Sequence, residues 1–572
     1  MNASRGEVVW RIACVALVVV YLLTSPQSWQ FESFDELDYV GLARSLAAGD
    51  GYTMEGVTHT LYPPAYPLLL SIIHRLDPRG WAWMYMLNAL CGSLACVIAA
   101  TWIRRSFGTP GKLAGWLALG SYYSWSFSTR YLISEPLFLL GSFFALGCAW
   151  RGLNGDSRWR YWPAGVAVGL LLSAMTRSGA VALTAALFLA GVLHALLNDK
   201  RSGFKLAVAS AIAGGGFFLF WEVRAAVMNP DARESYFLWA ARFLGLSTGE
   251  GTLVAANPGE GVTDATATWG GRCLHLVHEV GEYLASAARP GDNFGPLAML
   301  LAFCVVTGAC VHMSRHRSSP LALYLAVSLV VFSLTSWVTS YPRYLYVVGP
   351  LLYLFAVEGA AFLGDGRPGQ RLLFLLTGLM GLTITWRTGA DFVPGESLEE
   401  RYQAAQFVVC AVLYCLCIVQ SVRPLRMGPI VCALMITLPA LNFAHSGMLL
   451  FHRWKSQQTG EALRAKNMTG LEQCAEWLRT QTPENARILS SFPRLATILA
   501  DRMVMPAPMD TGASLAGFPG YVLLSGDLVG VPAFRQHDER ALETMAKAAG
   551  FVAVFEAGDA AVLAPQAGAG AE

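Results

Sequence analysis

Residues 81–105 read WAWMYMLNALCGSLACVIAATWIRR, a predominantly apolar run that ends on the pair Arg104-Arg105. A helix needs about 20 apolar residues to cross the hydrocarbon core of a bilayer. The run over 81–103 has that length, and the two arginines follow it directly. Because Lys and Arg gather in the short cytoplasmic loops of membrane proteins, the stretch predicts a membrane-spanning helix that ends at the cytoplasmic face.

The composition of the whole chain also indicates a membrane protein. Of its 572 residues, 54% are hydrophobic and only 14% are charged, whereas a soluble domain carries about 25% charged residues. So few charges cannot cover a water-facing surface. The 17 tryptophans suit a bilayer protein with aromatic belts at its interfaces. The net charge of +2 gives no support to a nucleic-acid partner.

The same length criterion, applied along the chain, predicts about thirteen spans. They cover approximately residues 9–26, 81–103, 113–128, 132–150, 161–176, 179–197, 205–223, 294–313, 320–338, 344–363, 371–389, 404–420 and 427–450. With the N-terminus in the cytoplasm, six cytoplasmic connections in a row carry Lys or Arg. The positive-inside rule therefore predicts a cytoplasmic N-terminus and an extracytoplasmic C-terminus.

Three long segments then lie outside the cytoplasm, namely 27–80, 224–293 and 451–572. The tail 451–572 has ordinary charge density, and its pattern predicts strands near 487–491, 503–506 and 551–563 between helices. We expect a mainly α fold, in which residues 1–450 form a polytopic transmembrane bundle with amphipathic juxtamembrane helices. Residues 451–572 are expected to form a small extracytoplasmic α/β domain, and loop 224–293 is interpreted as a lid over a cavity.

The first outer segment contains Ser33-Phe34-Asp35-Glu36-Leu37-Asp38-Tyr39. Ser33 followed three residues later by Glu36 is a capping box, which predicts a helix start. Apolar residues continue at helical spacing until Gly49 and Gly51, so we expect a short amphipathic helix along the membrane surface. A second such helix is suggested by Pro63-Pro64-Ala65-Tyr66-Pro67 and the apolar run to Leu76.

The acids in the first turn of this helix have two interpretations. Acidic side chains complement the positive end of a helix dipole, and Glu36 fits that interpretation because it fills the capping-box position. Asp35 lies between Phe34 and Leu37 in a segment held against the bilayer. Partial desolvation there raises the basicity of a carboxylate, so Asp35 is a candidate general base.

Three further ionisable residues stand at the outer ends of predicted spans. Glu135, in Ser134-Glu135-Pro136, either caps a helix or belongs to a functional site, and the sequence leaves both open. Arg177 and Arg343 stand at outer span ends, where the positive-inside rule expects few Lys or Arg residues. They are interpreted either as ligands of a phosphate or other anion, or as snorkelling or ion-paired side chains.

The sequence gives weak support for a metal site or a disulfide. His275 and His278, followed by Glu279, have a spacing that places ligands on one helix face, but no third ligand is evident. We interpret this stretch as an amphipathic loop helix and predict no metal. Cys273 and Cys474 fall in segments predicted to be extracytoplasmic, where a disulfide and two free thiols are both open.

In their order, and on the same predicted side of the membrane, these pieces resemble the GT-C glycosyltransferase superfamily, in the branch of protein O-mannosyltransferases and lipid A aminoarabinose transferases. The resemblance is clearest over residues 1–180 and returns around 335–365. The motifs that carry it are the acidic helix start, Gly49-Asp50-Gly51-Tyr52, Pro63-Pro64-Ala65-Tyr66-Pro67-Leu68, Ser134-Glu135-Pro136-Leu137 and Arg343-Tyr344.

The resemblance implies transfer of a sugar from a polyprenyl-phosphate-linked donor at the outer face of the membrane, in a bacterial inner membrane with the C-terminal domain in the periplasm. The acceptor stays open between a glycolipid, a polysaccharide and a protein, and no cofactor is predicted, although some relatives bind a divalent metal ion. The site residues that it implies are catalytic Asp35, Glu36 and Glu135, phosphate-binding Arg177, Arg343 and Arg130, and substrate-binding Tyr39, His59, Tyr62 and Tyr344.

Two alternative functions stay open. A transporter of lipids or lipid-linked sugars is expected to carry ionisable residues deep in its spans, whereas the charges here stand at span ends. A non-catalytic membrane assembly protein with the same fold would tolerate the loss of Asp35 and Glu135.

Overall fold

A computed structural model describes two compact units of the chain, and each is treated by itself. The helical unit comprises Met1–Trp29, Thr60–Tyr66 and Trp81–Ser446, and the mixed unit comprises Gln30–His59, Pro67–Gly80 and Gly447–Glu572. The structure describes residues 5–25, 34–54, 57–77, 80–129, 131–155, 161–228, 269–285, 295–334, 341–363, 375–379, 382–383, 411–412, 415, 418–419, 470–483, 486–490, 500, 504–506, 515, 518–524, 542–558 and 560–566.

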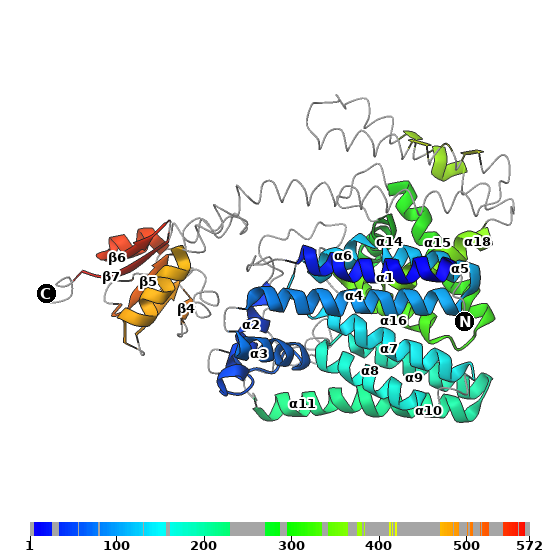
Figure 1. Cartoon of the computed structure of the whole chain (residues 1–572), viewed down its shortest axis with the longest axis horizontal. Helices are drawn as coiled ribbons and strands as arrows, with labels where there is room; N and C mark the ends of the chain where they lie inside the picture. Colours follow the sequence, from blue (N-terminus) through cyan, green and yellow to red (C-terminus); the bar gives the residue numbers. More distant parts are fainter. Residues whose placement is uncertain are drawn as a thin grey trace. The chain divides into compact units, whose positions relative to one another are not determined.

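The described part of the helical unit consists of helices packed along one another (Figure 1). They are α1 (Arg5–Thr24), α4 (Trp81–Ser106), α5 (Gly108–Leu119), α6 (Tyr122–Thr129), α7 (Glu135–Leu153), α8 (Trp162–Thr176), α9 (Ala180–Leu197), α10 (Lys200–Ser210), the π-helical turn η1 (Ala211–Gly215), α11 (Gly216–Met228), α14 (Trp269–Ala285), α15 (Gly295–Arg315), α16 (Pro320–Leu334), α17 (Tyr341–Tyr346) and α18 (Gly349–Leu363).

Within the described residues, six helices are long and apolar enough to cross a membrane, and four shorter helices are also apolar. The six are Gly6–Thr24, Trp81–Ser106, Glu135–Leu153, Ala180–Leu197, Lys200–Met228 and Ala298–Arg315. The predicted spans 371–389, 404–420 and 427–450 lie almost wholly outside the described residues. An integral membrane protein is therefore indicated by these apolar helices, and the number thirteen stays a prediction.

Two predicted spans are each divided into two helices, so the prediction of a single helix was wrong there. The span expected over 113–128 is interrupted between α5 and α6, where Gly120 ends α5 and the Ser121 hydroxyl accepts from the Ser124 amide at 3.4 Å. The span expected over 344–363 is divided between α17 and α18. The amides of Val347 and Val348 there bond three residues back, which tightens the backbone and ends α17.

Glycine contacts set how closely the helices of this unit approach. Gly308 on α15 faces Gly359 on α18, and a Cβ at either position would overlap a backbone carbonyl of the other helix. Between α7 and α8, a Cβ at Gly141 would lie 2.9 Å from the Gly169 carbonyl oxygen. Small residues at such crossings let two backbones touch, which is the main source of packing energy between helices in lipid.

The arginine pair that follows the 81–103 run is held by an acid of the first helix. Arg104 and Arg105 reach the Glu7 carboxylate at 2.7 and 2.9 Å. The Trp10 indole donates to the Thr101 hydroxyl at 3.2 Å and lies under the Arg104 guanidinium. These contacts join α1 to α4 at one end of both helices.

The mixed unit contains the two predicted helices of the first outer segment and a small sheet; the second helix is amphipathic, whereas the prediction of an amphipathic first helix was wrong. The predicted helix of the acidic motif is α2 (Phe34–Ala48), and Gly49 after it adopts φ 93°, a conformation that favours glycine. A two-stranded ladder of β1 (Thr53–Met54) and β2 (Val57–Thr58) follows α2. The second predicted helix is α3 (Ala65–Leu76), whose first two residues belong to the helical unit.

The sheet of the mixed unit has the strand order β4-β3-β5-β7-β6. Its strands are β3 (Ile488–Ser490), β4 (Val504–Pro506), β5 (Tyr521–Leu524), β6 (Phe551–Ala557) and β7 (Ala560–Pro565). β3 pairs in parallel with β4 and β5, while β7 pairs antiparallel with β5 and β6. A helix over 470–481 precedes β3, another over 542–548 precedes β6, and β5 was not predicted from the sequence.

Cys273 lies in the helical unit and Cys474 in the mixed unit, so the disulfide between them stays a prediction. Cys474 is buried, and burial raises the pKa of its thiol to about 11. A buried thiol with a raised pKa is a poor nucleophile at neutral pH, so Cys474 serves as a packing residue.

We predict that Gly308→Ala destabilises the protein by about 1–3 kcal/mol, because the new methyl group overlaps the Phe355 carbonyl on α18. Thermal unfolding of the purified protein in detergent should show a lower midpoint. Gly216→Ala is the matched control, since a Cβ at that helical glycine meets nothing within 4 Å. Equal midpoints for the two variants would contradict the close α15–α18 contact.

Candidate functional site

The centre of the candidate site is the Glu135 carboxylate at the first residue of α7. Glu135 is fully buried, and its Oε1 atom accepts from the Nε–H of Arg343 and lies 2.5 Å from a terminal nitrogen of Arg177. In the described part of the chain, its Oε2 atom has no hydrogen-bond partner. The structure thus brings together three of the residues that the sequence singled out at span ends.

Helix packing explains why Arg177 meets Glu135. α7 and α8 are close neighbours that pack through Gly141 and Gly169, and the Ser142 and Ser173 hydroxyls lie 3.3 Å apart across the contact. The first residue of α7 and the last residue of α8 lie at the same end of this helix pair. Arg177 follows α8 in an extended conformation, with φ −156° and ψ 144°, so its side chain leaves the helix axis at the start of α7.

The segment that leads into Glu135 is fixed by a buried asparagine of α4. The Asn88 amide donates to the carbonyls of Ser128 and Tyr131 at 3.2 and 2.7 Å, and its oxygen accepts from the Tyr66 hydroxyl at 3.2 Å. The Ser128 hydroxyl lies 2.9 Å from that of Tyr346, at the end of α17. These bonds hold α17, which carries Arg343, beside the start of α7.

The two arginines of the site remain partly exposed while the carboxylate between them is buried. Two guanidiniums meet one carboxylate, and the arginine side chains are 19% and 20% exposed while that of Glu135 is 1% exposed. The Tyr344 ring lies 5.9 Å from the Arg177 guanidinium carbon and stacks on Phe332. A partly exposed pair of guanidiniums suits an anion, and guanidinium geometry suits phosphate in particular.

The acids of the first outer loop lie in the mixed unit, in the first turn of α2. Asp35 is partly exposed, whereas Glu36 and Asp38 are buried. Tyr39, a predicted substrate contact, is also buried, at 2% exposure. His59 packs edge-on against Tyr52 in the same unit. Asp35 is therefore the most exposed acid of this turn.

The remaining predicted residues are placed as follows. Tyr62 belongs to the helical unit and is partly exposed. Arg130, predicted as a third phosphate ligand, lies outside the described residues, and so does most of the predicted lid over 224–293. Of that loop, α14 is described, and it begins at Trp269.

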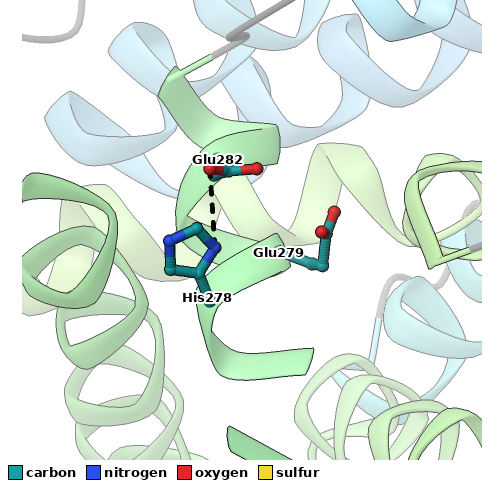
Figure 2. Close-up of side chains that lie close together, drawn as sticks. All are labelled: His278, Glu279 and Glu282. Carbon is teal, nitrogen blue, oxygen red and sulfur yellow. Dashed lines mark ion pairs between the residues drawn. The ribbon is translucent and has the colours of Figure 1, made fainter. Parts of the chain in front are cut away.

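α14 gathers a second group of ionisable side chains that sequence reasoning saw only in part. His278 and Glu279 are joined by Glu282, one helical turn further on (Figure 2), and the signal for it was the spacing His-Glu-x-x-Glu. Burial raises the pKa values of the Glu279 and Glu282 carboxyls to about 7, with the Glu279 charge adding to the shift of Glu282. Burial also lowers the pKa of the His278 imidazole.

The chain shares its fold with solved structures of ArnT, a polytopic match that covers its full length. The crystal structure of ArnT from Cupriavidus metallidurans bound to undecaprenyl phosphate matches 100% of this chain and 100% of its own, with a TM-score of 0.54 and 15% identity. ArnT in the apo state matches 99% and 100%, with a TM-score of 0.54 and 14% identity.

An archaeal oligosaccharyltransferase, AglB from Archaeoglobus fulgidus in complex with an inhibitory peptide and a dolichol-phosphate, matches 96% of this chain and 69% of its own, with a TM-score of 0.45 and 12% identity. No family model and no curated protein sequence matches the chain. The resemblance predicted from short motifs is therefore confirmed at the level of the fold.

We predict strong coupling between Glu135 and Arg343 in a double-mutant cycle. Glu135→Gln and Arg343→Gln should each destabilise the protein, because each removes an ion pair of the buried Glu135 carboxylate. The double variant should lose at least about 1 kcal/mol less than the sum of the single losses, measured by denaturant unfolding in detergent. Additive losses would contradict the ion pair. The exposed pair Glu543 and Lys547 is the control, with coupling below about 1 kcal/mol.

Proposed function

We propose that this chain transfers a sugar from a polyprenyl-phosphate-linked donor to an acceptor at the extracytoplasmic face of a bacterial inner membrane. The observation that carries the proposal is the buried Glu135 carboxylate, which holds the partly exposed guanidiniums of Arg177 and Arg343 at one point. Such a pair suits the phosphate group of a lipid-linked donor. The cytoplasmic N-terminus and periplasmic C-terminal domain belong to the same proposal.

The two arginines act on the leaving group. When an acceptor oxygen attacks the anomeric carbon, a new glycosidic bond forms and the bond from that carbon to the phosphate oxygen breaks. The electron pair of the broken bond stays on the lipid phosphate, whose negative charge grows. Positively charged donors that are already in position lower the energy of this transition state, and they need no reorganisation during the reaction.

Glu135 is a positioning residue in this scheme. Its Oε1 atom is engaged by both guanidiniums, so the carboxylate orients them. For the acceptor proton we retain the Asp35 carboxylate, which the resemblance implies as the base. Asp35 is the partly exposed acid of its helical turn, which suits exchange of a proton with an acceptor hydroxyl.

The fold supports the donor class. ArnT, whose structure matches the full length of this chain, was determined with undecaprenyl phosphate bound. A polyprenyl phosphate carries its sugar on a phosphate at the membrane surface, and no nucleotide is required on that side. The acceptor is a glycolipid, a polysaccharide or a protein.

We predict that Arg343→Gln lowers the rate of sugar transfer by roughly 100- to 1000-fold, as expected for the loss of one group that stabilises the transition state. The assay uses purified full-length protein, a panel of radiolabelled polyprenyl-phosphate sugars and a membrane extract as acceptor. Arg105→Gln is the control, because Arg105 pairs with Glu7, away from Glu135. Unchanged transfer by Arg343→Gln would show that the arginine pair is not part of the donor site.

Asp35→Asn is expected to lower transfer by roughly 100- to 10,000-fold while the protein keeps its unfolding midpoint, because the amide cannot accept the acceptor proton. Asp50→Asn, at the turn after α2, is the matched control. Equal transfer by Asp35→Asn and the unaltered protein would show that another group is the base. Absence of transfer from every donor would favour a non-catalytic protein.

A further inference from the structure

A buried asparagine lies within the apolar helix α4 and bonds outside its own helix. Asn88 is 1% exposed, and its amide nitrogen donates to the Ser128 carbonyl at 3.2 Å and to the Tyr131 carbonyl at 2.7 Å. Its oxygen accepts from the Tyr66 hydroxyl at 3.2 Å. A polar side chain is costly inside an apolar bundle unless it is bonded, so an amide with three distant partners indicates a specific role.

The two carbonyls that Asn88 binds lie where α6 ends. α6 finishes at Thr129, and the last four carbonyls of a helix have no partner within that helix. Ser128 supplies one of these carbonyls, and Tyr131 lies in the short stretch between α6 and the start of α7 at Glu135. By donating to both carbonyls, Asn88 fixes the direction in which the chain leaves α6, and therefore the place where Glu135 begins α7.

The α4 backbone packs closely against the same stretch, one turn after Asn88. A Cβ at Gly92 would overlap the Ser128 side chain and would lie 3.4 Å from Cβ of Pro136, the second residue of α7. Residues one turn apart share a face of a helix, so Asn88 and Gly92 lie on one face of α4. The chain between α6 and α7 is therefore held against α4 by hydrogen bonds and by close packing together.

Ser128 connects this part of α4 to Arg343. Its hydroxyl lies 2.9 Å from that of Tyr346, and both residues are fully buried. Tyr346 is the last residue of α17 and stands one turn after Arg343, whose Nε–H donates to Glu135. The placement of both partners of the ion pair thus depends on the stretch of chain that Asn88 binds.

We propose that Asn88 is a positioning residue for sugar transfer, and that it acts through Arg343 and Glu135. It fixes the two elements that carry the ion pair, so that the guanidinium stays where the leaving phosphate gains its charge. This inference rests on the proposed function. Because displacement of a reacting group by about 1 Å can lower a rate about 100-fold, loss of the Asn88 bonds should appear in the rate of transfer as well as in stability.

Sugar transfer by Asn88→Leu tests this role, since leucine fills a similar space and makes none of the three bonds. We expect the rate at saturating acceptor to fall roughly 10- to 100-fold. When Arg343 is already replaced by Gln, Asn88→Leu should lower the remaining rate by no more than about 3-fold, because residues that act as a unit are not additive. Full multiplication of the two losses, or unchanged transfer by Asn88→Leu, would overturn the proposal.

Asn88→Asp is the second variant, and it isolates the bonds to the two carbonyls. It keeps the size of the side chain and an oxygen for the Tyr66 hydroxyl, but it replaces the donating nitrogen. Ser93→Ala is the matched control, because Ser93 is a buried polar residue of α4 whose hydroxyl bonds to Leu90 of the same helix. The control should transfer sugar within about 3-fold of the unaltered protein. The unfolding midpoint of each variant shows whether it is folded.

A measurement without sugar transfer tests the same placement. The coupling between Glu135 and Arg343 is measured by a double-mutant cycle in denaturant unfolding, with Asn88 present and with Asn88→Asp. We expect Asn88→Asp to reduce the coupling by about half or more, and Ser93→Ala to leave it unchanged, because a close ion pair depends on where both partners lie. An unchanged coupling with Asn88→Asp would overturn the proposal, whether or not sugar is transferred.

The two measurements separate this inference from the proposed function. Reduced coupling together with transfer that depends on Asn88 supports both. Reduced coupling in a protein that transfers sugar from no donor would contradict the proposed function alone, and would still support the placement of Arg343 and Glu135 by Asn88.

Discussion

A carboxylate far from water is the constraint on which the helical unit depends. Glu135 is fully buried at the start of α7, and an isolated charge there would be strongly unfavourable. Arg177 and Arg343 offset that cost, so the end of α8 and the short α17 are bound to one point. The same requirement extends outward to Asn88, which fixes the segment before Glu135, and to Tyr346, which bonds Ser128 from the end of α17. A structural need for charge compensation thus produces a cluster with the composition of an anion site.

The sequence predicted the members of this cluster but not their contact. Glu135, Arg177 and Arg343 each stood out because ionisable residues at the ends of apolar spans need an explanation. Their meeting depends on how α7, α8 and α17 pack, and Arg343 is 208 residues from Glu135 along the chain. Hydropathy carries no information on such packing. Glu282 escaped notice for a similar reason, since its burial is set by the neighbours of α14 and not by its own helix.

The fold, like the site, was predicted only in part. Long apolar runs predicted α4, α7, α8 and α9 well, because length and hydropathy decide whether a helix can cross a bilayer. Hydropathy did not reveal the breaks between α5 and α6 or between α17 and α18, where polar hydrogen bonds end a helix inside an apolar run. β5 was missed, although β3 and β4, which are each one residue shorter, were predicted. The α2 helix, marked by an acidic start and by Gly49, was predicted from local signals alone.

Under the proposed function, the two guanidiniums beside Glu135 have a consequence for the lipid phosphate that is left after transfer. A sugar-bearing polyprenyl phosphate is a phosphodiester with one negative charge, whereas the lipid phosphate left after transfer is a monoester with about −1.5 to −2 charges near neutral pH. Two guanidiniums held by a single carboxylate therefore attract the product more strongly than the donor. In such an enzyme, release of the lipid phosphate from the arginines, and not cleavage of the bond to the sugar, would be the rate-limiting step.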